Sequence, residues 1–198
     1  MIVYVHGALQ SRRSFNYISC ALKEESRSQH FFSYDIRKEH GAEIVQRLIG
    51  LMKSLAPQEP VTFISHSYGG VLAVDAVRGL DSRQYNVISM ATPYGGSVEA
   101  SFLKLLKPSS ILLSNVGKYH SYMRTFSSKP LPCRVRGLVT TGGTAEWTTE
   151  SNDGIVTVAS QRHYEADPNW SGAFLNVNHF EVLMLPQAVK LIKNELES

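Results

Sequence analysis

Apolar runs typical of buried strands alternate with segments of helical periodicity along most of the chain. This alternation indicates an α/β domain with a mainly parallel sheet, because each crossover between parallel strands needs a connection long enough to hold a helix. The expected strands are residues 2–5, 31–36, 61–65, 85–90, 134–140 and 172–177, and the expected helices are residues 15–23, 42–55, 68–78 and 180–196.

Residues 97–130 interrupt this alternation. They contain an apolar, lysine-bearing stretch at residues 98–107 and a second apolar group made of Tyr119, Tyr122, Met123 and Phe126. The sequence holds no internal repeat, low-complexity tract or linker that would divide it. We therefore expect a single domain, residues 1–198, with one helical insert at residues 97–130 after the fourth strand.

The composition is that of an ordinary globular protein, with 43% hydrophobic and 19% charged residues. The net charge of +3 is too small to indicate a nucleic-acid partner. The sequence lacks the run of about eighteen apolar residues that a membrane span needs. Cys20 and Cys133 show neither metal-ligand nor redox spacing, and the first residues read as a strand rather than a signal peptide. We therefore expect a cytoplasmic protein without a bound metal.

The most informative motif is Ser-His-Ser-Tyr-Gly at residues 65–69, where an expected buried strand passes into an expected helix. A serine held on a tight strand-to-helix turn is the arrangement called a nucleophile elbow. Gly69 supplies the small residue that the turn needs after Ser67, and Ser65 stands where a glycine is usual before it. The positive end of the helix would favour an oxyanion beside Ser67. The alternative is that Ser67 only caps the helix.

Other motifs follow the same order along the chain as in one known group. His6-Gly7 follows the first strand, Ala-Thr-Pro-Tyr-Gly-Gly-Ser occupies residues 91–97, and Asn-Asp-Gly-Ile-Val occupies residues 152–156. Together with the elbow they resemble the α/β-hydrolase superfamily, in particular bacterial lipases and the lipase-like part of GPI inositol-deacylases. Tyr94 stands where the turn of that group has a histidine.

This resemblance implies a minimal α/β-hydrolase fold. Such a fold would have about six mainly parallel strands flanked by helices, and it would begin at a strand that the family counts as interior. The helical insert after the fourth strand would be a possible lid, and no cofactor would be needed.

A serine nucleophile needs a base, and in this fold the chain order is serine, acid, histidine. His179 follows the last expected strand, where the fold delivers its histidine, and His163 is the alternative. Asp153 lies in a turn that matches the acid turn of the family, although Asn-Asp-Gly also forms tight turns for purely structural reasons. The other acidic candidates are Glu146, Glu150, Glu165 and Asp167.

The resemblance also implies an oxyanion hole. Its two donors would be the backbone N–H of Tyr68, which follows the nucleophile, and the N–H of Ala8, just past His6-Gly7. Asp35 is expected to form a structural pair with Arg37, because Asp-Ile-Arg resembles the Asp-x-Arg loop of related hydrolases.

The sequence therefore predicts a serine hydrolase that cleaves a carboxylic ester, with a small-molecule or lipid acyl ester as substrate. A thioesterase or amidase with the same triad and a catalytically silent binding module are the alternatives. Residues 98–107 suggest either weak contact of the insert with a membrane surface or an ordinary helical excursion.

Overall fold

The protein is described by a computed structural model that places residues 1–97, 110–117, 120–146 and 148–197. These residues contain a six-stranded sheet in which every pair of neighbouring strands is parallel, in the order β2-β1-β3-β4-β5-β6. The strands are β1 (Ile2–Val5), β2 (Gln29–Phe32), β3 (Val61–His66), β4 (Tyr85–Met90), β5 (Val135–Thr140) and β6 (Trp170–Leu175). The predicted α/β class and six parallel strands are confirmed.

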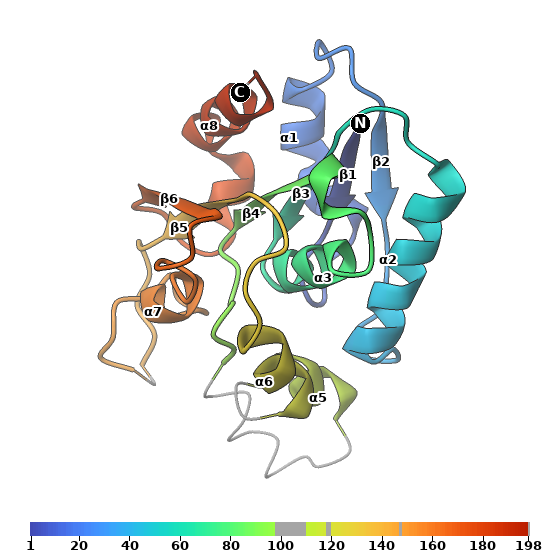
Figure 1. The fold of residues 1–198 in the computed structure, drawn as a ribbon. Helices are drawn as coiled ribbons and strands as arrows, with labels where there is room; N and C mark the ends of the chain where they lie inside the picture. Colours follow the sequence, from blue (N-terminus) through green and yellow to red (C-terminus); the bar gives the residue numbers. More distant parts are fainter. Residues whose placement is uncertain (98–109, 118–119, 147, 198) are drawn as a thin grey trace.

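Helices cover both faces of this sheet (Figure 1). The α-helices are α1 (Asn16–Ala21), α2 (Gly41–Leu55), α3 (Tyr68–Val77), α5 (Ile111–Val116), α6 (Ser121–Ser127), α7 (Val158–Gln161) and α8 (Pro186–Glu197). Short 3-10 helices are η1 (Arg12–Phe15), η2 (Ser82–Gln84) and η3 (Glu181–Met184). One core lies under α2, α3 and α6, and a second core lies under α1, η3 and α8.

The apolar periodicity of α2 explains how one face of the sheet is covered. Ile44, Leu48 and Met52 recur at four-residue spacing and are fully buried. Glu43 accepts a hydrogen bond from the backbone N–H of His40, which completes a capping box at the start of the helix. Burial of this stripe places α2 beside α3, the helix that follows the elbow.

Four of the expected elements differ from the structure by two or more residues at a boundary or by a break. The first helix ends at Ala21 instead of residue 23. The second strand is Gln29–Phe32 instead of 31–36, because the backbone N–H of Tyr34 donates to His6 Nε2 instead of to a strand. The sixth strand is Trp170–Leu175 instead of 172–177, in register with β5 along its length. The closing helix is broken at Leu185, which is extended, since Pro186 has no N–H to continue the helical ladder.

The described part of the insert is anchored to the body of the protein. Met123 and Phe126 of α6 are buried in the core, and the hydroxyl of Tyr122 donates to Asp75 Oδ2 at 3.1 Å. The guanidinium of Arg78 lies 4.6 Å from the centre of the Phe126 ring. Residues 98–107 and Tyr119, which carry the rest of the predicted apolar side of the insert, lie outside the described residues.

No helix in the described part of the chain combines the length and the apolar character required for a membrane crossing.

Candidate active site

Ser67 stands at a strained turn between β3 and α3. Its φ of 52° and ψ of −129° lie in a region that residues other than glycine rarely adopt. The Ser67 N–H donates to the carbonyl of Met90 at 2.8 Å, and the Ser67 carbonyl accepts from the N–H of Gly70 at 3.0 Å. The Ser67 side chain makes no capping hydrogen bond, so the capping role is wrong. The half-buried hydroxyl is left available for other chemistry.

The residues on either side of Ser67 show why the turn tolerates Ser65 but requires Gly69. A Cβ atom on Gly69 would lie 2.2 Å from the carbonyl oxygen of Val5, so only glycine allows α3 to start this close to β1. Ser65 is fully buried, and its hydroxyl donates to the carbonyl of Ile88 at 3.2 Å. The serine in place of the usual glycine is therefore accommodated by a hydrogen bond to β4.

Asp153 and His179 form a buried pair. The Nδ1–H of His179 donates to Asp153 Oδ2 at 2.8 Å, and the backbone N–H of His179 donates to the Asp153 carbonyl at 3.0 Å. Their exposed fractions are 1% and 3%. Because a carboxylate only accepts, Nδ1 carries the proton, and Nε2 of a neutral His179 is left free to accept one.

The carboxylate of Asp153 has further partners on both oxygens. Oδ2 also accepts from the hydroxyl of Thr140 at 2.6 Å and from Gln161 Nε2 at 3.3 Å. Oδ1 accepts from the N–H groups of Ile155 at 3.0 Å and Val156 at 2.7 Å. Burial alone would raise the pKa of Asp153, but the hydrogen bonds from His179, Thr140 and Val156 outweigh it and lower that pKa below its usual value. Asp153 thus shapes its turn and also accepts from His179.

The loop after β1 holds the backbone of Ala8 in a fixed direction. The carbonyl of Gly7 accepts from His6 Nδ1–H at 2.8 Å and from the N–H of Gln10 at 3.3 Å. Because the Gly7–Ala8 peptide is planar and trans, the N–H of Ala8 points opposite to that carbonyl. Within the described part of the chain, neither the Ala8 N–H nor the Tyr68 N–H donates a hydrogen bond.

Gly7 brings this loop against the nucleophile. A Cβ atom built on Gly7 would lie 3.0 Å from Ser67 Cβ, so the loop and the elbow are in close contact. The segments that carry the N–H groups of Ala8 and Tyr68 therefore both adjoin Ser67.

His66 links the loop after β1 to the segment that carries His179. Its Nε2 lies 2.8 Å from the His179 carbonyl, and its Nδ1 lies 2.9 Å from Gln10 Oε1, which also accepts from the Gly7 N–H at 2.9 Å. Burial, followed by the nearby His179, lowers the pKa of His66 to about 3. A neutral His66 has one ring N–H, which it donates to one of these two oxygens at a time.

No hydrogen bond joins the Ser67 hydroxyl to the His179 ring in the described residues. The two residues are nevertheless held near each other, because His66 precedes Ser67 and contacts His179, with ring centres 4.8 Å apart. Hydrogen bonds between a nucleophile and its base are often long before substrate binds.

Three of the alternative candidates make their contacts elsewhere. His163 is exposed and its Nε2 donates to the Ser127 carbonyl at 3.0 Å, whereas Asp167 accepts from the N–H groups of Leu131 and Asn169. Glu165 forms an ion pair with Arg162. None of these contacts places His163, Asp167 or Glu165 beside Ser67.

Two further expectations have clear outcomes. Asp35 and Arg37 form the expected pair, with Arg37 Nε and Nη2 each donating to the carboxylate at 2.9 Å. Tyr94, in place of the histidine of the related turn, is buried between Phe126 and Tyr164 and serves the core.

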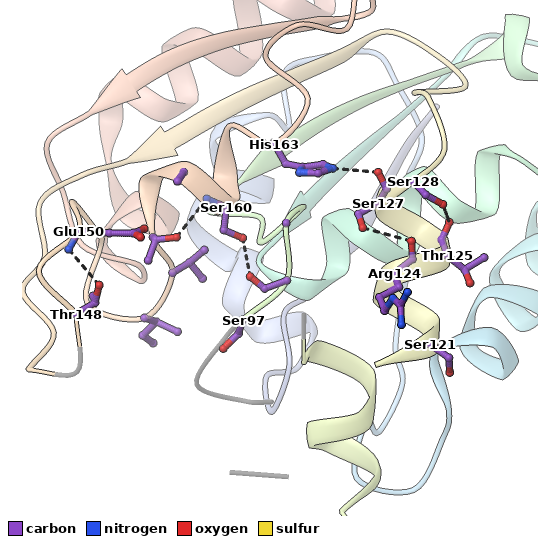
Figure 2. Close-up of a pocket in the computed structure, with 16 residues that line it drawn as sticks. Ser97, Ser121, Arg124, Thr125, Ser127, Ser128, Thr148, Glu150, Ser160 and His163 are labelled. Carbon is purple, nitrogen blue, oxygen red and sulfur yellow. Dashed lines mark hydrogen bonds between the residues drawn. The ribbon is translucent and has the colours of Figure 1, made fainter. Parts of the chain in front are cut away.

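A cavity of about 1090 Å³ opens beside the turn that carries Asp153 (Figure 2). Thr148, Glu150 and Ser160 stand on one side, and hydroxyls and Arg124 from α6 stand on the other. Ile155 and Val156 connect it to the acid turn, but its lining includes neither Ser67 nor His179. The cavity is therefore adjacent to the candidate site and separate from the reacting atoms.

The described residues contain no group of three or more histidine, cysteine, aspartate or glutamate side chains arranged to hold a metal ion.

Comparison with known proteins supports the fold. The structure matches a carboxyl esterase of metagenomic origin with a TM-score of 0.78 and 18% identity, over 99% of this chain and 75% of the esterase. It matches the mature lipase BlEst2 of Bacillus licheniformis with a TM-score of 0.74 and 18% identity, over 98% of this chain and 91% of the lipase. The type II thioesterase BorB of the borrelidin biosynthetic cluster matches with a TM-score of 0.66 and 16% identity, over 100% of this chain and 91% of the thioesterase.

The chain therefore has the α/β-hydrolase fold that these enzymes share, and the resemblance seen in the sequence is confirmed at this level. No model of a known family matches the sequence, and no curated protein is similar to it.

Four residues contact the candidate site in a way that no motif in the sequence indicates. Thr140 and Gln161 bind Asp153, whereas Gln10 and His66 connect the loop after β1 to His179. Their only hint is position: Thr140 is the last residue of β5 and His66 the last of β3, at the sheet edge where ligands bind in folds of this kind.

Proposed function

We propose that this protein is a serine hydrolase that cleaves a carboxylic ester through an acyl-enzyme, with Ser67, His179 and Asp153 as its triad. The observation that carries the proposal is the 2.8 Å hydrogen bond between His179 Nδ1 and Asp153, which orients the ring. It stands beside a serine whose strained backbone is typical of a nucleophile elbow.

The proposed reaction has two halves. Ser67 Oγ attacks the ester carbonyl while His179 Nε2 takes its proton, and the C–O bond to the alcohol then breaks as His179 returns that proton to the leaving oxygen. Water attacks the acyl-enzyme in the same way, which releases the acid and restores Ser67. Asp153 stays ionised throughout, consistent with its lowered pKa, and stabilises the imidazolium.

The oxyanion of each tetrahedral intermediate would be bound by the N–H groups of Tyr68 and Ala8. Their lack of acceptors within the described part of the chain supports this role, because an unpaired N–H beside a nucleophile is already oriented for developing charge. Removal of one such donor typically costs about 3 kcal/mol of transition-state stabilisation.

Two alternatives use the same fold. A thioesterase would use the same residues, since thioester and ester carbonyls pass through the same kind of intermediate. A catalytically silent binding module does not require a buried carboxylate that accepts hydrogen bonds on both oxygens, one of them from a histidine. That network favours an enzyme.

The test is hydrolysis of p-nitrophenyl esters of increasing acyl length and of a matched acyl thioester. We expect turnover of the esters by the wild type, and none above background by Ser67→Ala or His179→Ala. His163→Ala, which changes a histidine outside the triad, should keep wild-type activity. Turnover of the thioester alone would favour the thioesterase alternative. A folded wild type that hydrolyses neither substrate would contradict the proposal.

A further inference from the structure

Four exposed apolar side chains belong to the segments that follow β1 and His179 in the chain. Leu9 and Met184 are each 65% exposed, Phe180 is 50% exposed, and Tyr17 is 42% exposed. Single exposed apolar residues are normal on a protein surface, but a contiguous group indicates a binding surface. Leu9 follows Ala8 and Phe180 follows His179, so this group begins at the oxyanion loop and at the proposed base.

Contacts between the segments that carry these residues place them in the same region of the molecule. The Phe180 ring lies 6.2 Å from the ring of His66, whose Nδ1 contacts Gln10, the residue after Leu9. On the adjacent side, α1 packs against η3. Their inner residues Ile18 and Val182 share one core, whereas Tyr17 and Met184 on the same two helices are exposed.

Two arginines border this group. Arg12 and Arg13 of η1 are exposed, and they lie between Leu9 and Tyr17 in the sequence. In the part of the chain that the structure describes, no carboxylate forms an ion pair with either arginine. The neighbouring carboxylate of Glu181 accepts from the N–H of Asn178 in its own loop. The charge beside the apolar group is therefore mainly positive.

We propose that this α1–η3 surface, made of Leu9, Tyr17, Phe180 and Met184 with Arg12 and Arg13, docks the protein on an anionic lipid surface. Apolar side chains beside unpaired arginines are the combination that binds such a surface, through buried apolar area and attraction to negative headgroups. Docking in this orientation presents Ser67 to the bilayer, so the substrate is an ester of the lipid itself. This substrate class rests on the proposed function, whereas the docking does not.

The sequence analysis placed a weak membrane contact at residues 98–107 of the insert, and these lie outside the described residues. One of the two described helices of the insert, α6, has its apolar residues Met123 and Phe126 buried in the core. It therefore does not offer these two side chains to a membrane.

The experiment is sedimentation with vesicles of phosphatidylcholine, with and without phosphatidylglycerol. The wild type is expected to bind the vesicles that contain phosphatidylglycerol more tightly. The double variant Tyr17→Ser/Met184→Ser should bind at least about tenfold more weakly to both kinds of vesicle, because its apolar area is lost. Arg12→Gln/Arg13→Gln should lose the preference for phosphatidylglycerol, since each arginine near an anionic surface contributes a factor of about five.

Phe174→Ser is the matched control, because Phe174 is 53% exposed but lies on β6, outside the α1–η3 surface. It should bind vesicles like the wild type. A wild type that stays in the supernatant would overturn the docking surface, as would equal losses in Phe174→Ser and Tyr17→Ser/Met184→Ser.

Hydrolysis of a short, soluble ester by each variant separates this inference from the proposed function. Hydrolysis of the soluble ester without vesicle binding would contradict the docking proposal alone. Vesicle binding without any esterase activity would contradict the proposed function and would support the docking surface.

Discussion

The proposed nucleophile and the proposed acid–base pair are held at the same edge of the sheet by different means. Ser67 is positioned by its backbone, with a positive φ between β3 and α3 and a side chain that makes no capping bond. Asp153 and His179 are positioned by side-chain hydrogen bonds among segments far apart in the chain. A serine hydroxyl without a capping hydrogen bond, beside a histidine oriented by a hydrogen-bonded carboxylate, suits nucleophilic catalysis, because the hydroxyl must form a new bond while the base keeps its direction.

The largest loss of kcat should follow from a change in the hydrogen bond between Asp153 and His179. In Asp153→Asn the amide offers an N–H where His179 Nδ1–H needs an acceptor, which favours the wrong tautomer of the ring. We expect kcat for ester hydrolysis to fall by about 10⁴-fold.

Asp167→Asn is the control for that prediction, because Asp167 also accepts backbone N–H groups but lies outside the site. Its kcat should stay close to that of the wild type. Similar rates for the Asp153→Asn variant and the wild type would mean that Asp153 does not orient the base.

A smaller loss of kcat is expected when a partner of Asp153 is changed instead of Asp153 itself. Gln161→Leu removes the amide that donates to Asp153 and to the Thr140 carbonyl, and that accepts from the Thr140 N–H. Unpaired buried groups cost about 1–3 kcal/mol each, so stability should drop by this order and kcat by about tenfold to a hundredfold. Urea unfolding and steady-state kinetics measure the two effects. Gln84→Leu, at an exposed position of η2, should change neither.

Substitutions in the loop after β1 should reduce kcat less than substitution of Asp153. Gln10→Ala removes the acceptor of the Gly7 N–H and the partner of His66, so the Ala8 N–H is less well directed. We expect kcat to fall by about tenfold with KM little changed, which is the signature of an interaction that matters mainly in the transition state. Gln10→Glu keeps an oxygen at both contacts and should restore most of the rate. Equal losses in the two variants would count against this positioning role.

The smallest effect is a pH dependence of stability. The folded-state pKa of Asp153 is lowered, so its contribution to stability is present above its unfolded pKa of about 3.9 and is lost as the pH falls through the folded value. The difference in free energy of unfolding between the wild type and Asp153→Asn should therefore be largest near neutral pH and should narrow below about pH 4. Ser67→Ala, which removes no carboxylate, should show a constant difference. A constant difference for Asp153→Asn as well would contradict the lowered pKa.

The comparison also explains what could be predicted from the sequence. The parallel sheet and the elbow follow from local patterns, since β3, Ser67 and α3 are continuous in the chain. The pairing of Asp153 with His179 joins residues 26 positions apart and was expected only from resemblance to known hydrolases. Gln161 and Gln10 could not be assigned at all, because a glutamine becomes part of a site only through its partners in space.

Strand ends were the least predictable part of the fold. Tyr34 and Ile36 are buried, so their pattern continues that of β2, but Tyr34 bonds to His6 after the strand has ended. The break before α8 depends on Pro186, which a purely apolar periodicity does not register.

The most direct test of the central claim is labelling with a fluorophosphonate, followed by mass mapping of the modified peptide. The account predicts a single adduct on Ser67 in the wild type, no adduct in Ser67→Ala, and much slower labelling in His179→Ala, because the base is missing. An adduct on another serine, or labelling that survives Ser67→Ala, would contradict the assignment of Ser67 as the nucleophile.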